Sequence, residues 1–153
     1  MQTFKACFSH DEKLWKLRKI TRNDEDAYND VKEVVIDFYQ DLKEIFQVAA
    51  IQYGASLDFD MTSFRKFCKD AGILNKQLTS SVLDTYFKAT NYEEIDQENN
   101  DDNAIIRFEF LEILVRIARG KYIDFGKDKR LDYSMTKLVQ QHIMPMSSKL
   151  WHL

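Results

Sequence analysis

The chain has 153 residues, a one-domain length that can bury a single hydrophobic core. Apolar residues make up 44% and charged residues 31%, and a net charge of −3 argues against nucleic-acid binding through a basic field. No stretch approaches the ~18 uninterrupted apolar residues of a membrane span, and the first residues lack the apolar run of a secretory signal. We therefore expect a cytoplasmic protein that binds neither nucleic acid nor membrane, with Cys7 and Cys68 as reduced thiols.

The composition favours an all-α fold, because 4 Gly and 1 Pro supply little of the turn chemistry that short strands need. Near the N-terminus, a short amphipathic piece carries Leu14, Trp15, Leu17 and Ile20 at near-helical spacing. This piece either packs on the body through Trp15 or serves as a partner-binding arm.

A long helix is predicted over residues 24–53, where apolar residues follow the i, i+3, i+4, i+7 rule for five turns. Residues 24–26 are acidic and suit the positive end of the helix dipole, and Gly54 is a plausible stop. The helix is either a core element or a strut along an elongated partner.

Two shorter helices follow an extended segment at residues 56–61. The first starts after a cap at Asp60 or Thr62, ends at Gly72, and carries Cys68 on its apolar face, so this thiol reads as an inert core group. The second starts after a cap at Thr79 or Ser80 and carries an apolar face of Val82, Leu83, Tyr86 and Phe87.

An acidic run at 91–103 separates these helices from the most apolar helix of the chain. Its apolar residues lie almost all round, which predicts a central core element: Phe108, Leu111, Ile113, Leu114, Val115, Ile117 and Ala118. Gly120 is expected to close this helix, with two arginines in its last turn.

A basic segment, RGKYIDFGKDKR, comes next and is set around Tyr122 and Phe125. A last helix is expected from near Asp132 to Pro145, followed by a tail with an exposed hydrophobic end, Leu150, Trp151 and Leu153. The candidate partner-binding residues are these cations and the tail indole: Arg116, Arg119, Lys121, Lys127, Lys129, Arg130 and Trp151. The alternative is that the cations are helix-end charges and a solvated loop.

The stretch before the apolar helix imitates the back half of an EF-hand calcium loop. Ile105 fits loop position 8 and Glu109 fits position 12, which places Glu98 at position 1. The preceding helix, however, places position 1 at Asn91, so nineteen residues stand where twelve are wanted. The acidic loop 92–103 is therefore either a solvated loop or a calcium site of unusual length.

The partner loop offers no carboxylate at the first ligand positions, which fall on Gln52, Gly54 and Ser56. The arrangement of an EF-hand pair is still predicted without its ion site, because residues 57–59 and 105–107 lie where paired EF-hand loops touch through a two-strand bridge. We predict an all-α fold of paired degenerate EF-hand-like helix–loop–helix units, with extra N- and C-terminal helices, that bridge, and no cofactor or metal. The expected division is an N-terminal arm at 1–22, the helical domain at 23–145 and a hydrophobic tail at 146–153.

The stretches FRKFCKDAGILNKQLTSSVLDTYFKATN and IIRFEFLEILVRIARGKY resemble the helical core of the tubulin polymerization-promoting protein family. The shared features are Lys69-Asp70, then Leu83, Asp84 and Phe87, then Arg107 with FEF at 108–110, and last Ile117, Ala118, Lys121 and Tyr122. The resemblance covers residues 45–144. It implies microtubule binding, and related domains occur in proteins of cilia and flagella. The acidic run, the long helix and the tail depart from the family and fit a fixed structural component better than a free tubulin-polymerising protein.

The resulting hypothesis is a non-catalytic adaptor of the microtubule cytoskeleton, in a cilium or axoneme, that binds tubulin or neighbouring axonemal proteins as a subunit of a larger assembly. The alternative is a calcium sensor of the EF-hand type. An enzyme is disfavoured, because the three histidines are scattered and no phosphate loop, HExxH or nucleophile elbow occurs.

Overall fold

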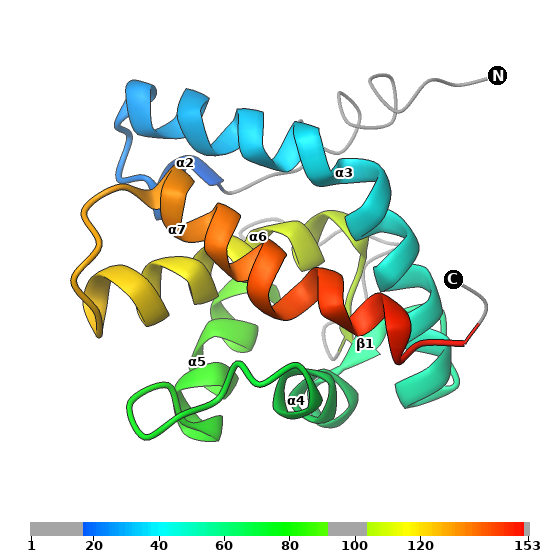
Figure 1. Cartoon of the computed structure of the whole chain (residues 1–153). Coiled ribbons are helices and arrows are strands. Elements are labelled where there is room, and N and C mark those ends of the chain that lie inside the picture. Colours follow the sequence, from blue (N-terminus) through cyan, green and yellow to red (C-terminus); the bar gives the residue numbers. More distant parts are fainter. Residues whose placement is uncertain (1–16, 92–103, 152–153) are drawn as a thin grey trace, which may run out of the picture.

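The computed structural model describes residues 17–91 and 104–151 as helices, two short strands and their connections (Figure 1). The elements in chain order are α2 (Leu17–Ile20), α3 (Glu25–Gly54), β1 (Phe59–Asp60), α4 (Met61–Asp70), α5 (Ser80–Asn91), β2 (Ala104–Ile105), α6 (Arg107–Arg119), the π-helical turn η1 (Gly120–Asp124), α7 (Leu131–Leu138), the π-helical turn η2 (Val139–Ile143) and the 3₁₀ turn η3 (Met144–Ser148). The predicted all-α fold is confirmed. Within the described ranges, no helix combines the length and the apolar character that crossing a membrane requires.

Side-chain caps start three of these helices where the sequence placed them. The Asp24 carboxylate accepts a hydrogen bond from the Ala27 amide at 3.1 Å, and the Asp60 carboxylate accepts one from the Ser63 amide at 2.7 Å. At α5 the cap is Thr79, whose hydroxyl accepts from the Val82 amide at 3.4 Å. These local bonds fix where the chain turns into each helix.

The end of α3 differs in detail from the expected glycine stop. Gly54 is the last helical residue, but the left-handed residue that ends the helix is Ala55, with φ of 52°. The Ala55 amide reaches back to the carbonyls of Ala50 and Ile51, so the C-cap geometry holds without glycine in that position.

The two strands form the predicted bridge. They pair antiparallel, with Phe59 opposite Ile105 and Asp60 opposite Ala104. Both central side chains, Phe59 and Ile105, are fully buried. The bridge therefore joins the two helix–loop–helix units at the core.

A cluster of five phenylalanine rings surrounds this bridge. The rings come from α3, β1, α4 and α6, and their centroids lie 5.3 to 6.3 Å apart: Phe46, Phe59, Phe64, Phe67 and Phe110. Tilted and edge-on pairs at these distances add to the free energy of burying each ring. The cluster ties the N-terminal half of the fold to α6.

Helix α6 is the central element, as its all-round apolar pattern predicted. It contacts α2, α3, α5 and α7, and Figure 1 shows α7 passing in front of it. As expected, α6 ends at Arg119 with Gly120 as its C-cap residue, but the chain does not leave the helical path there: it continues through the π-helical turn η1 to Asp124, and Gly120 has an ordinary helical φ of −61°. Glycine is needed there for space: a Cβ on Gly120 would clash with the Tyr86 hydroxyl and lie 2.8 Å from Tyr86 Cζ.

The C-terminal helix also runs further than expected. It begins at Leu131 and passes through η2 and η3 to Ser148, since Pro145 sits in the first turn of η3, where no backbone N–H is required. Leu150, expected to be exposed, is only 6% exposed, whereas Trp151 is 48% exposed. Leu153 lies outside the described residues.

Three further expectations concern the termini and the cysteines. Ile20 is buried, but Leu14, Trp15 and Cys7 lie outside the described residues, so the role of the N-terminal piece stays a prediction, as do the domain boundaries at 22 and 145.

Cys68 is a fully buried free thiol. Burial raises its pKa well above the ordinary value, in agreement with an inert core group.

Candidate partner-binding site

The structure divides the predicted basic residues into two groups with different surroundings. Arg116, Arg119 and Lys121 lie on α6 and η1 and are only partly exposed, whereas Lys127, Lys129 and Arg130 lie on the exposed connection from η1 to α7. This connection, residues 125–130, is called the basic loop below. It projects at the left edge of Figure 1.

The first group is engaged inside the molecule. The Arg119 guanidinium donates to the Ile20 carbonyl and lies 3.8 Å from the Asp124 carboxylate, so it joins α6 to α2 and η1. The Lys121 ammonium donates to the Ile73 carbonyl at 2.9 Å, and burial lowers its pKa. These two cations hold the fold and offer little charge to a partner.

Arg116 of α6 is half-buried, and its Nε has no hydrogen-bond partner among the described residues. Burial lowers its pKa, and the nearby Glu112 carboxylate opposes that shift. A partly desolvated guanidinium of this kind is a packing group first, because its stem covers apolar surface.

The second group is exposed. Lys127 and Lys129 have no ion pair or hydrogen bond to any residue within 17–91 or 104–151. Arg130 is held by two carboxylates, at 2.8 Å from Asp132 and 3.7 Å from Asp30 on α3, and it stacks 4.2 Å from the centre of the Tyr133 ring. The hydrogen bond to Asp132 raises the Arg130 pKa.

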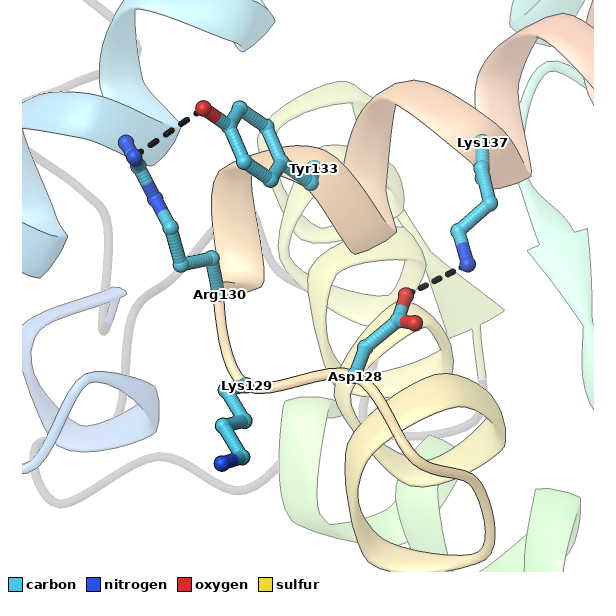
Figure 2. A pocket seen from close by; sticks show the side chains of 5 residues that line it. All are labelled: Asp128, Lys129, Arg130, Tyr133 and Lys137. Atoms are coloured by element: carbon cyan, nitrogen blue, oxygen red, sulfur yellow. Dashed lines mark hydrogen bonds and ion pairs between the residues drawn. The ribbon is translucent and has the colours of Figure 1, made fainter.

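A shallow hollow of about 440 Å³ lies beside the basic loop and is lined by Asp128, Lys129, Arg130, Tyr133 and Lys137 (Figure 2). The Asp128 carboxylate accepts from Lys137 at 2.6 Å and from Ser134 at 3.1 Å, and its hydrogen bond with Lys137 lowers the Asp128 pKa. In Figure 2 the Lys129 side chain points away from these paired groups. The lining thus combines fixed ion pairs with a free lysine and a phenol ring.

Trp151 does not belong to this surface. Its backbone amide donates to the Gln52 side chain at 3.0 Å, at the C-terminal end of α3. The N-terminal part of α3 is the part that meets Arg130, and Figure 1 shows the basic loop at the left and the red end of the described chain, after η3, at the right. The predicted residue set therefore contains two separate surfaces.

Two aromatic side chains of the surface were not among the predicted site residues. Phe125 is 39% exposed and Tyr133 is 59% exposed. Phe125 stands within the basic segment, and Tyr133 lies two positions before the inward Met135, which points it to the opposite side of α7. The helical pattern could therefore have marked Tyr133 as an outward residue.

Residues that match ligand positions of a calcium loop form hydrogen bonds that stabilise the fold. The Glu109 carboxylate, assigned to the last ligand position, is buried and accepts from the Ile106 amide at 3.2 Å at the start of α6. In the partner loop, the Ser63 hydroxyl donates to the Tyr53 carbonyl at 3.3 Å. Residues 92–103 lie outside the described residues, and in the remaining chain no three His, Cys, Asp or Glu side chains are grouped to hold a metal. The calcium-sensor alternative stays a prediction.

Comparison with known protein families gives one match. The p25-alpha family model matches residues 43–149, well over half of the chain and close to the range of the resemblance, residues 45–144. The chain belongs to the p25-alpha family. No curated protein and no solved structure shows a significant match.

Membership in the p25-alpha family confirms the resemblance to the tubulin polymerization-promoting proteins. It indicates a non-enzymatic, tubulin- or microtubule-related role with cytoskeletal association. The matched range contains the basic loop and the hollow, and it leaves out most of α3.

Proposed function

We propose that this chain is a non-catalytic adaptor of the microtubule cytoskeleton that docks on tubulin or on a neighbouring axonemal protein through its basic loop. A position in the cilium or flagellum, as a subunit of a larger assembly, is part of the proposal. It rests on the family and on the arrangement of charge described above.

The observation that carries the proposal is a pair of exposed lysines, Lys127 and Lys129, which have no ion pair or hydrogen bond within the described residues. They lie at one edge of a chain with a net charge of −3. The outer surface of a microtubule is acidic, so a local cationic loop is attracted while most of the chain is repelled. This asymmetry orients the chain and favours contact through the loop. The internally bonded Arg119 and Lys121 contribute to holding the loop in place.

The added elements support a structural component over a free polymerising factor. Six carboxylates lie on one exposed side of α3, spaced three or four residues apart: Asp26, Asp30, Glu33, Asp37, Asp41 and Glu44. We call this the acidic stripe; all but its last residue precede the range matched by the family model. A surface of that charge is suited to a neighbour other than the microtubule wall.

Co-sedimentation with microtubules at low salt tests the proposal. The double variant K127E/K129E should bind about ten-fold more weakly than wild type and show a shallower salt dependence, because it reverses the two charges that are free to meet the partner. The matched control is K66E/K76E, which makes the same charge change at two exposed lysines on α4 and in the α4–α5 connection. Equal loss in both variants, or no binding by wild type, would contradict the proposal.

The location is tested separately in a ciliated cell. A tagged chain should be retained in detergent-extracted axonemes and be released from them by high salt. A chain found wholly in the soluble fraction would contradict the axonemal part of the proposal. The microtubule contact would still be tested by the binding measurement.

A further inference from the structure

The basic loop is held in one conformation at its N-terminal end. The Phe125 amide donates to the Gly120 carbonyl at 2.9 Å, and the Asp128 amide donates to the Tyr122 carbonyl at 2.8 Å. A Cβ on Gly126 would lie 2.5 Å from that same Tyr122 carbonyl oxygen, so the tight return requires glycine. The loop therefore leaves η1 along a fixed path.

The loop is also held at its C-terminal end, where it enters α7. The Asp128 carboxylate is clamped by Ser134 and Lys137 of α7, and Arg130 bridges to Asp30 of α3 and to Asp132. Acidic and basic groups at this end satisfy one another. What remains outward is one phenyl ring, one phenol ring and two lysines.

Within the loop itself, the outward groups Phe125 and Lys127 stand two residues apart and combine apolar and cationic character. Phe125 keeps 39% of its surface exposed, and Lys129 lines the hollow together with Tyr133, which is 59% exposed. Aromatic side chains supply much of the affinity of protein interfaces, and charges at the rim act mainly on approach and orientation. A rigid loop loses little conformational entropy when it binds.

We propose that the basic loop is a preorganised docking loop in which Phe125 is the apolar anchor of the microtubule contact. The inference rests on the proposed function and names the chemistry of the partner surface: an apolar pocket of a folded protein rimmed by carboxylates. Phe125 enters the pocket, and Lys127 and Lys129 face the carboxylates.

A folded acidic protein fits this surface better than an anionic membrane. Polybasic membrane segments use clusters of about 4–8 cations. The basic loop carries two lysines without a partner among the described residues, Lys127 and Lys129, with the carboxylates of Asp30, Asp124 and Asp132 close by. Those carboxylates would be repelled by a uniformly negative surface. They would not be repelled by a pocket whose few acidic groups face the two lysines.

The experiment is microtubule co-sedimentation of the full chain with F125A over a series of salt concentrations. We expect the Kd of F125A to rise about ten-fold or more at every salt concentration, with the salt slope of wild type retained. K127E/K129E should instead flatten the slope. The matched control is L57A, which truncates a side chain that is 77% exposed beyond the C-terminal end of α3 and should bind as wild type does.

Four outcomes decide the inference, and circular dichroism with a thermal melt first confirms that F125A is folded. Weaker binding of F125A at constant slope supports the anchor. Wild-type binding by F125A together with loss in K127E/K129E overturns the anchor and leaves the proposed function standing. No binding by wild type overturns both. Binding of wild type, but not F125A, to phosphatidylserine vesicles in the absence of microtubule binding overturns the protein partner in favour of a lipid one.

Discussion

Gly120 shows how one residue couples two helices in this fold. Its φ is helical, so alanine would be preferred there by intrinsic helix propensity, by about 1 kcal/mol. The Tyr86 ring of α5 lies directly against the position of the missing Cβ. The choice of residue is therefore set by the close approach of α5 to the end of α6, and not by helix termination.

We predict that G120A destabilises the chain by about 1–3 kcal/mol, the usual cost of inserting a methyl group into a filled contact. Y86A removes the ring that the methyl group would meet, so G120A should cost much less in a Y86A background. Urea unfolding of the two single variants and the double variant measures the coupling. Strict additivity would show that Tyr86 is not what excludes a side chain at position 120.

At the scale of elements, the residues that carry the family resemblance mostly join helices. The Arg65 guanidinium makes two bonds of 2.9 Å to the Asp84 carboxylate, which links α4 to α5. The Tyr53 hydroxyl donates to the Asp70 carboxylate at 2.7 Å, which links α3 to α4. The family pattern thus preserves the frame that joins the helices.

In helix α3, by contrast, the charged surface residues do not stabilise the fold: the acidic stripe destabilises the helix on which it lies. Glu33, Asp37 and Asp41 follow one another at intervals of four residues, and like charges at that spacing repel. The helix is maintained by its buried face, where Val31, Val35 and others are fully buried. Stability and surface charge are set on opposite sides of the same element.

We predict that D37K stabilises the chain by about 1 kcal/mol at low salt, since it turns two repulsive i, i+4 pairs into attractive ones. The gain should shrink as salt is raised. Thermal or urea unfolding at two salt concentrations provides the measurement, and Q47K, at an exposed position of α3 outside the stripe, is the control. A gain of the same size in Q47K would point to the net charge of the whole chain instead of the stripe.

For the whole molecule, one buried thiol and three partly buried phenols, all of raised pKa, contribute to the response to alkaline pH. Burial raises the pKa of the Cys68 thiol, and burial followed by the hydrogen bond to Asp70 raises the pKa of Tyr53. Burial likewise raises the pKa of Tyr86 and Tyr122. In each case the native chain keeps a proton that the unfolded chain releases at about pH 9 to 10.

We therefore expect stability to be fully present below about pH 8 and to fall as pH rises above 9, because the unfolded state then binds fewer protons than the native state. The midpoint of urea unfolding should drop between pH 8 and pH 10.5. It should drop less in C68A and in Y53F, each measured relative to its own midpoint at pH 8. A midpoint that is flat with pH in wild type, or an undiminished drop in both variants, would contradict this.

Much of the frame could be predicted because it depends on local patterns. The start of α3 at its acidic residues, the cap at Asp60, the core face of α3 and the all-round apolar α6 follow from spacing and composition. The continuation of the helical path past Gly120 and Pro145 could not be predicted, because it depends on what packs beside the residue or on which turn type follows it. The predicted exposure of Leu150 was wrong for the same reason, since this side chain packs into the core of the fold.

By itself, the sequence determined the helices, the pairing of the strands beside Phe59 and Ile105, and the family, because side-chain periodicity and capping act within a few residues along the chain. Only the tertiary structure decided which cations are available to a partner. Arg119 and Lys121 bond to carbonyls far away in sequence, Ile20 and Ile73, whereas Lys127 and Lys129 bond to no group in the part of the chain that the structure describes. Charge can be counted from a sequence, but its availability depends on the groups that the fold brings against it.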